Sequence, residues 1–207
     1  MEIILLIRHA ENDMIGKAVA GRLSGVHLNA AGQAQARDLA EHLTLLPIKR
    51  ICSSPLERAL ETAEPLAQKL GMDVHIRPQL IEMDPGDWTG MDLLKLRKLP
   101  EWQDFLSARG RVRMPGGERL TEVQARMVDE VENLRREFPD QMLALFSHGD
   151  PIRSALAFYA GIPLDFLARI EVSPASVSAI RFHQRGPQIL CINRMIDFPM
   201  YIDKLTT

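Results

Sequence analysis

Short, almost entirely apolar runs recur along this chain, and two of them end abruptly in basic side chains. Residues 3–7 (IILLI) lead straight into Arg8 and His9, and the run MLALFS at 142–147 leads into His148. Runs of this length that are apolar throughout are typical of strands buried on both faces of a parallel sheet. Segments with helical apolar spacing lie between them, so strands and helices alternate. This alternation predicts an α/β fold with a mostly parallel central sheet.

Turn and capping signals place the other elements. Asn29 is expected to cap a helix that runs to Leu43, and residues 49–53 predict a short strand. The run Ser54-Pro55-Leu56-Glu57 has the form of a capping box, which predicts a helix starting just after the serine, with a kink at Pro65 and an end at Gly71. The remaining expectations are a strand at 74–77, amphipathic helices at 120–134 and 150–160, and a β-hairpin within 168–194.

The length of 207 residues predicts a single domain over 1–207. Between 78 and 119 the pattern weakens, with four prolines and several short helical candidates. We expect a lid-like excursion from the domain there, at about 83–117.

Composition excludes several classes of protein. The net charge of −2 gives no overall basic field, so neither nucleic acid nor an anionic membrane is an expected partner. No apolar run approaches the roughly 20 residues that span a bilayer, and the N-terminus has no signal-peptide pattern. Cys52 and Cys191 show no pairing pattern, which favours a reducing cytoplasm.

Basic side chains follow three of the predicted strands. Arg8 and His9 follow the first, Arg58 lies early in the helix after the second, and His148 follows the strand at 142–147. Ligands of open parallel sheets bind beyond the carboxyl ends of the strands, so these side chains are expected to converge there. Such a cluster is costly unless an anion joins it, and the forked guanidinium groups suit phosphate. The sequence therefore predicts a phosphate pocket at this edge of the sheet.

Each residue alone also has a structural explanation. An isolated arginine or histidine after a strand is most often structural or solvated. Asp150, close to His148, is better explained as a cap of the helix that follows. A metal site is not expected, because no Asp/Glu cluster stands near the two histidines at ligand spacing and the arginines would repel a cation.

Five motifs, in order from about residue 3 to 153, resemble those of the histidine phosphatase superfamily, the phosphoglycerate-mutase-like proteins. They are RHAE at 8–11, SSPLERA at 53–59 with TA at 62–63, LIE at 80–82 with GDWTG at 86–90, PGGE at 115–118, and SHG at 147–149. The resemblance implies a three-layer α/β sandwich. Two departures are Ala10, where the family usually has glycine, and Asn12, often threonine or serine in the family.

The resemblance also implies roles for the matched residues. His9 would be the nucleophile that forms a phosphohistidine, with its other ring nitrogen held by a backbone carbonyl. Arg8, Arg58 and His148 would bind the phosphoryl oxygens, and Glu82 would be the general acid and base, with Asp84 and Asp87 as rivals. Asn12 and Arg22 are the expected substrate contacts. No metal and no cofactor is implied.

The expected activity is hydrolysis of phosphomonoesters of a small metabolite, without a metal. Mutases of this family are generally longer, so mutase-type phosphoryl transfer is the alternative, and a catalytically silent phospho-ligand binder is another. Basic residues of the excursion could meet a second acidic group on the substrate or form a solvated face; they are Lys95, Arg97, Lys98, Arg109, Arg111 and Arg113. The hairpin and the tail FPMYI could cover a core or a partner, which leaves a homodimer open.

Overall fold

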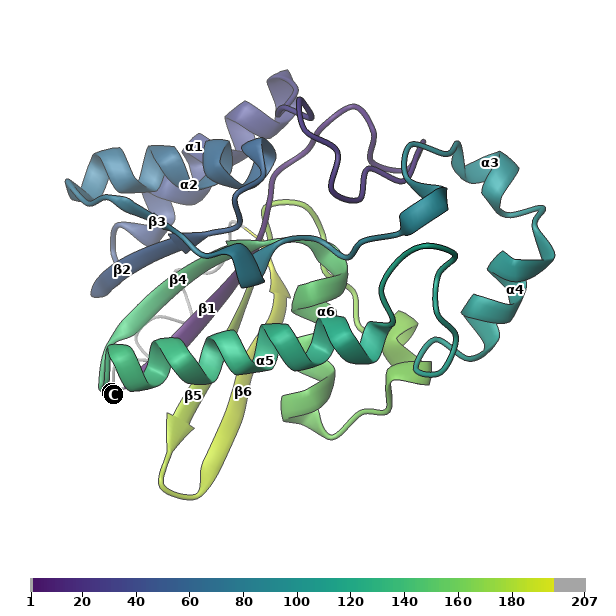
Figure 1. Ribbon diagram of the computed structural model, residues 1–207. Coiled ribbons are helices and arrows are strands. Elements are labelled where there is room, and N and C mark those ends of the chain that lie inside the picture. The colour runs from purple at the N-terminus through teal and green to yellow at the C-terminus, as the bar shows by residue number, and fades with distance from the viewer. Residues whose placement is uncertain (1, 196–207) are drawn as a thin grey trace.

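The computed structural model describes residues 2–195 and is built around a six-stranded sheet (Figure 1). The strands are β1 (Glu2–Arg8), β2 (Ile48–Ser53), β3 (Val74–Ile76), β4 (Met142–Ser147), β5 (Val177–His183) and β6 (Gly186–Arg194). Their order is β3-β2-β4-β1-β5-β6. The four strands from β3 to β1 pair in parallel, whereas β5 is antiparallel to both β1 and β6. The predicted mostly parallel sheet is confirmed.

Helices cover both faces of this sheet, with α1 and α2 on one face and α5 and α6 on the other (Figure 1). Their bounds are Ala30–Leu43, Glu57–Leu70, Leu120–Glu137 and Gly149–Ala160. The side chains of β1 alternate between the two layers: Ile3, Leu5 and Ile7 join the core under α1 and α2, and Ile4 and Leu6 join the core under α5 and α6. Because both faces of β1 are buried, its sequence has to be apolar without a break. The three-layer α/β sandwich is confirmed.

Most of the local signals are also confirmed. The Asn29 side chain accepts a hydrogen bond from the Gly32 N–H at the start of α1. Gly71 and Gly161 end α2 and α6 in the left-handed conformation, with φ of 63° and 66°. Helix α2 continues through Pro65 as far as Leu70.

The predicted capping box at 54–57 is wrong. Helix α2 begins only at Glu57, its N-cap is Leu56, and no side chain caps it. The Ser54 hydroxyl lies 2.7 Å from Nε2 of His148, and the Glu57 carboxylate accepts from the Gly25 N–H at 3.0 Å. Ser54 and Glu57, which the local pattern assigned to the helix start, therefore make tertiary contacts instead.

The excursion contains two short helices, α3 (Leu93–Leu96) and α4 (Pro100–Ser107), which lie apart from the sheet (Figure 1). Backbone hydrogen bonds tie it to the loop that follows β1. The Val19 N–H donates to the Met91 carbonyl at 3.0 Å, and the Gly90 N–H donates to the Val19 carbonyl at 2.7 Å. These two segments, distant in sequence, thus form one connected layer.

No helix among residues 2–195 is long and apolar enough to cross a membrane. The FPMYI tail, for which a covering role was considered, lies outside the described residues.

Candidate active site

His9 lies directly after β1 with its side chain buried. Its Nδ1 atom is 2.8 Å from the Ala10 carbonyl oxygen, and a carbonyl can only accept a hydrogen bond. Nδ1 must therefore carry the proton, which leaves a lone pair on Nε2. Burial, with the charges of Arg58 and Arg8, lowers the pKa of His9 to about 3. His9 is a neutral imidazole with a basic nitrogen available, held as predicted by a backbone carbonyl.

His148 lies beside His9 because the strands before them are paired. β1 and β4 are parallel neighbours with Arg8 opposite Ser147, so the next residue of each strand falls at the same edge. The ring centroids are 5.2 Å apart. Burial, with the proximity of His9, lowers the pKa of His148 well below its ordinary value. Both rings are therefore neutral at pH 7.

Two arginines, the buried Arg58 and the half-buried Arg8, flank the histidines with donors to spare. Arg58 is only 1% exposed and uses one nitrogen on the Gly21 carbonyl at 2.7 Å, while Arg8 uses one on the Val172 carbonyl at 2.7 Å. Three other guanidinium nitrogens are buried without a hydrogen-bond partner among the described residues: Nε of Arg8, and Nε and NH1 of Arg58. Burial lowers the pKa of both arginines. Each unmatched buried donor costs about 1–3 kcal/mol, which an anion would recover.

Thr62 connects the loop after β1 to α2. Its hydroxyl accepts from the Ala10 N–H at 2.9 Å and donates to the Arg58 carbonyl at 2.7 Å. Ala10 itself lies outside the left-handed region, so alanine at this position imposes no strain. The departure from the family's glycine therefore leaves the loop intact.

Glu82 is the one of the three rival carboxylates that lines the cavity with His9. Its Oε1 accepts from the Met83 N–H at 2.8 Å. Burial, with the negative charge of Asp150, raises the pKa of Glu82 to about 7. Asp84 instead accepts from the Gly86 N–H at 2.9 Å, and Asp87 is exposed.

Arg22, a predicted substrate contact, does not line the cavity. Its Nε donates to the Glu82 carbonyl at 2.9 Å, and its NH2 pairs with Glu118 at 2.9 Å. Arg126 donates to the same carbonyl at 3.1 Å and pairs with the same carboxylate at 3.1 Å. This network holds the backbone of Glu82 in place. Neither Arg126 nor the part played by Glu118 was predicted, because the contacts join segments about 40 residues apart in sequence.

Asn12, a predicted substrate contact, is buried and lines the cavity. Its Oδ1 accepts from the Met14 N–H at 3.0 Å, so its amino group is the part that can donate to a ligand. Asp150 lines the cavity too, and its prediction as a helix cap is wrong. The N-cap of α6 is His148, no side chain caps the helix, and the Asp150 carboxylate contacts Arg153 at 3.3 Å.

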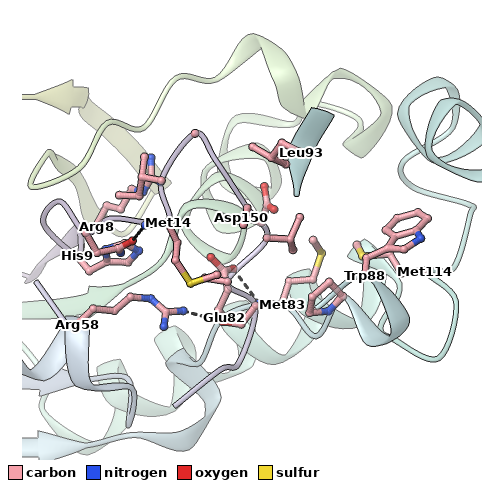
Figure 2. A pocket seen from close by; sticks show the side chains of 18 of the residues that line it. Arg8, His9, Met14, Arg58, Glu82, Met83, Trp88, Leu93, Met114 and Asp150 are labelled. Carbon is pink, nitrogen blue, oxygen red and sulfur yellow. Dashed lines mark hydrogen bonds between the residues drawn. The ribbon is translucent and has the colours of Figure 1, made fainter. Parts of the chain in front are cut away.

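The cavity holds about 270 Å³ and has two chemically different ends. Figure 2 shows Arg8, His9 and Arg58 together at one end and Glu82 near the middle. Methionine, tryptophan and leucine side chains occupy the other end. Of the six basic residues of the excursion that the sequence left open as substrate contacts or a solvated face, only Arg109 lines this cavity. Within residues 2–195 there is no group of three or more His, Cys, Asp or Glu side chains that could hold a metal ion.

Comparisons with known proteins show which chains this one is similar to. The chain is 30% identical to phosphoserine phosphatase 1 of Hydrogenobacter thermophilus, covering 92% of this chain and 91% of the relative. It is 28% identical to a probable phosphoglycerate mutase, GpmB, of Cronobacter sakazakii, covering 87% of this chain and 85% of the relative. A mycobacterial glucosyl-3-phosphoglycerate phosphatase, solved with VO3, superposes with a TM-score of 0.85 at 26% identity, covering 93% of this chain and 99% of that one.

A family model described as the histidine phosphatase superfamily (branch 1) matches residues 4–195. This range contains all five motifs and every residue of the site described above. The chain belongs to the histidine phosphatase superfamily, branch 1.

Proposed function

We propose that this protein hydrolyses phosphomonoesters of small metabolites through a phosphohistidine on Nε2 of His9. The observation that carries the proposal is the neutral His9 ring, whose lone pair on Nε2 lies in a cavity with the unmatched donors of Arg8 and Arg58. A nucleophile must be unprotonated to attack, and the phosphoryl group it attacks needs positive charge around its oxygens. This cavity contains both the unprotonated nucleophile and the positive charge. The cavity is smaller than the roughly 300–1,000 Å³ typical of drug-sized ligand pockets, which supports a small substrate.

The reaction proceeds in two steps. In the first, His9 Nε2 bonds to phosphorus as the ester P–O bond breaks, and Glu82 gives its proton to the departing alkoxide oxygen. In the second, Glu82 takes a proton from water as that water attacks the phosphohistidine, which releases phosphate and restores His9. Arg8, Arg58 and His148 stabilise the charge on the three phosphoryl oxygens in both steps, and Asn12 donates from its amino group.

Hydrolysis is favoured over mutase-type transfer by the charge distribution of the cavity. A mutase has to hold an intermediate with two phosphate groups, which calls for a second set of cations. Within residues 2–195, Arg109 is the only basic side chain that lines the cavity beyond the end formed by Arg8 and Arg58. A silent binding protein is disfavoured by Glu82, because a binder has no need of a carboxyl group with a raised pKa next to the anion. Mutase activity stays the second candidate because mutases are among the relatives.

Release of phosphate and isomerisation of 3-phosphoglycerate, measured on the same preparation, test the proposal. We expect phosphate release from simple esters, unaffected by a chelator, and no isomerisation. His9→Ala should abolish release, whereas His75→Ala, which alters an exposed histidine on β3, should not. Efficient isomerisation, loss of activity in the chelator, or equal rates for the two variants would each contradict the proposal.

The same proposal covers the domain organisation of the protein, its place in the cell and its partners. Residues 1–207 would act as one domain, with the excursion at 83–117 as a lid over the cavity. Cys52 and Cys191 are both free thiols, which favours the cytoplasm. The partner is the phosphorylated substrate, and neither nucleic acid nor a membrane is proposed as one.

A further inference from the structure

Many of the side chains that line the cavity are apolar and differ in chemistry from the phosphate end. We propose that these side chains form a leaving-group pocket selective for phosphate monoesters of mainly apolar alcohols, aromatic or branched aliphatic, over esters of polyols and hydroxy acids. This inference rests on the proposed function, because it concerns the alcohol part of the ester that His9 would attack.

Apolar side chains from two segments line this part of the cavity. The loop after β1 contributes Met14, Ile15, Ala18 and Val19, and the excursion contributes Met83, Pro85, Trp88, Leu93, Trp102, Phe105 and Met114. Three of the aromatic rings pack together, with Trp88 5.4 Å from Trp102 and 5.8 Å from Phe105 between ring centroids. The pocket wall is therefore built as part of a packed cluster, and it is not a chance opening between loops.

The position of Glu82 links these apolar side chains to the ester P–O bond that breaks. In Figure 2 Glu82 lies between the phosphate end, marked by His9 and Arg58, and the apolar end, marked by Met83 and Trp88. A phosphoryl group on the arginines would place the ester oxygen near Glu82, which has to protonate it. The carbon chain attached to that oxygen then extends toward the apolar side chains.

Charged side chains are scarce at this end. Among the residues that the structure describes, Asp150 and Arg109 are the only charged side chains that line the cavity beyond Glu82. The Asp150 carboxylate already contacts Arg153 at 3.3 Å, and the Arg109 guanidinium lies 5.3 Å from the centre of the Phe105 ring. A sugar or glycerol body would bury hydroxyl groups against thioether, indole and alkyl surface without enough partners, which costs affinity. An apolar alcohol has no hydroxyl groups of its own to pair there and gains from its own burial.

The test compares substrates that all release unactivated alkoxides, so that the rates report recognition. The apolar probe is phenethyl phosphate, and the polar probes are glycerol 3-phosphate, O-phosphoserine and 3-phosphoglycerate. We expect kcat/KM for phenethyl phosphate to exceed that for each polar probe at least tenfold, the scale on which apolar pockets discriminate. A preference for any polar probe would overturn the inference and leave the proposed hydrolase in place. Hydrolysis of none of the four would count against the hydrolase itself.

Neighbouring leucines of α3 provide a matched pair of variants. Leu93 lines the cavity, whereas Leu94 is 68% exposed on the same short helix. Leu93→Asn should lower the ratio of kcat/KM for phenethyl phosphate over glycerol 3-phosphate by about tenfold, and Leu94→Asn should leave that ratio unchanged. Ile15→Asn, which alters a lining residue of the loop after β1, gives a second reading should the α3 variant fold poorly. An unchanged ratio in both lining variants would overturn the inference.

Discussion

At the scale of single residues, one physical cause moves two pKa values in opposite directions. Burial disfavours any charged form, so it lowers the pKa of the base His9 to about 3 and raises that of the acid Glu82 to about 7. Near pH 6 the imidazole is therefore neutral while the carboxyl is still protonated. The proposed first step needs both states, because the neutral imidazole attacks phosphorus while the protonated carboxyl group donates its proton.

The raised pKa of Glu82 predicts how the rate depends on pH. For esters with alkoxide leaving groups, kcat should fall about tenfold per pH unit above pH 7 as the carboxyl group loses its proton. Asp150→Asn removes a negative charge that helps to raise this pKa, so the falling limb should move to lower pH. Asp73→Asn, on an exposed residue after α2, is the control and should leave the profile in place. A limb that stays fixed in Asp150→Asn, or that moves to higher pH, would contradict this assignment.

Single residues also show how far sequence reasoning reaches. Arg8, His9, Arg58 and His148 could be predicted to meet because each is anchored to a strand end or a first helical turn. The contact of Ser54 could not be predicted. The sequence around Ser54 is typical of a helix cap, yet its hydroxyl contacts His148. The prediction that Asp150 caps a helix failed for a similar reason. A capping signal is local, whereas the position of a carboxylate in a cavity depends on residues far away in sequence.

At the scale of elements, the loop after β1 and the excursion pack closely against each other at Gly21. Gly21 has φ of 49°, and a Cβ added to it would lie 2.5 Å from the Pro85 ring. The carbonyl of the same residue accepts the Arg58 hydrogen bond. The fit between loop and excursion therefore also sets the position of an arginine at the phosphate end.

Gly21→Ala should consequently affect both stability and substrate binding. We expect a loss of about 2 kcal/mol or more in the free energy of unfolding, together with a raised KM. Gly25→Ala is the matched control, because Gly25 also has a positive φ, of 72°, but nothing within 4 Å of an added Cβ. It should cost about 1 kcal/mol and leave KM unchanged. Urea unfolding and steady-state kinetics measure both effects, and equal losses in the two variants would show that the Pro85 contact is unimportant.

Elements with strong local signals were predicted with their approximate bounds, whereas the bounds of the helices in the excursion were not. Its short helices, α3 and α4, are four and eight residues long and carry little periodicity of their own. Their placement depends on backbone bonds to the loop after β1, such as the Leu93 N–H to the Lys17 carbonyl at 2.8 Å. No sequence pattern within the excursion or the loop predicts these hydrogen bonds between them.

At the scale of the whole molecule, the site depends on strands that are separated in sequence but adjacent in the sheet. β4 lies between β2 and β1, which brings Arg58, His148 and His9 to one edge. Alternating strands and helices predict a parallel sheet, but they leave the strand order open. The antiparallel β5–β6 pair was predicted as a hairpin, while its position beside β1 was not.

Because the anion site is assembled from these separate elements, an anion should stabilise the whole fold. It binds the native state and has no site in the unfolded chain. Inorganic phosphate at 100 times its Kd should add about 2.7 kcal/mol and raise Tm by roughly 5–10 °C, relative to chloride at equal ionic strength. Arg58→Met should remove most of this shift, and Arg97→Met, at an exposed position, should keep it. A shift of equal size in both variants would mean that phosphate binds elsewhere.

Trapping the phosphorylated enzyme tests the central claim, nucleophilic attack by His9, most directly. Glu82→Gln with p-nitrophenyl phosphate is the condition of choice, because nitrophenolate departs without a proton donor whereas the second step still needs the missing base. We predict a burst of about one equivalent of nitrophenolate and an acid-labile phosphoryl group on the peptide that contains His9. Both should be absent when His9→Ala is added to the same variant. A phosphoryl group on any other residue, or a burst that survives the loss of His9, would contradict the account.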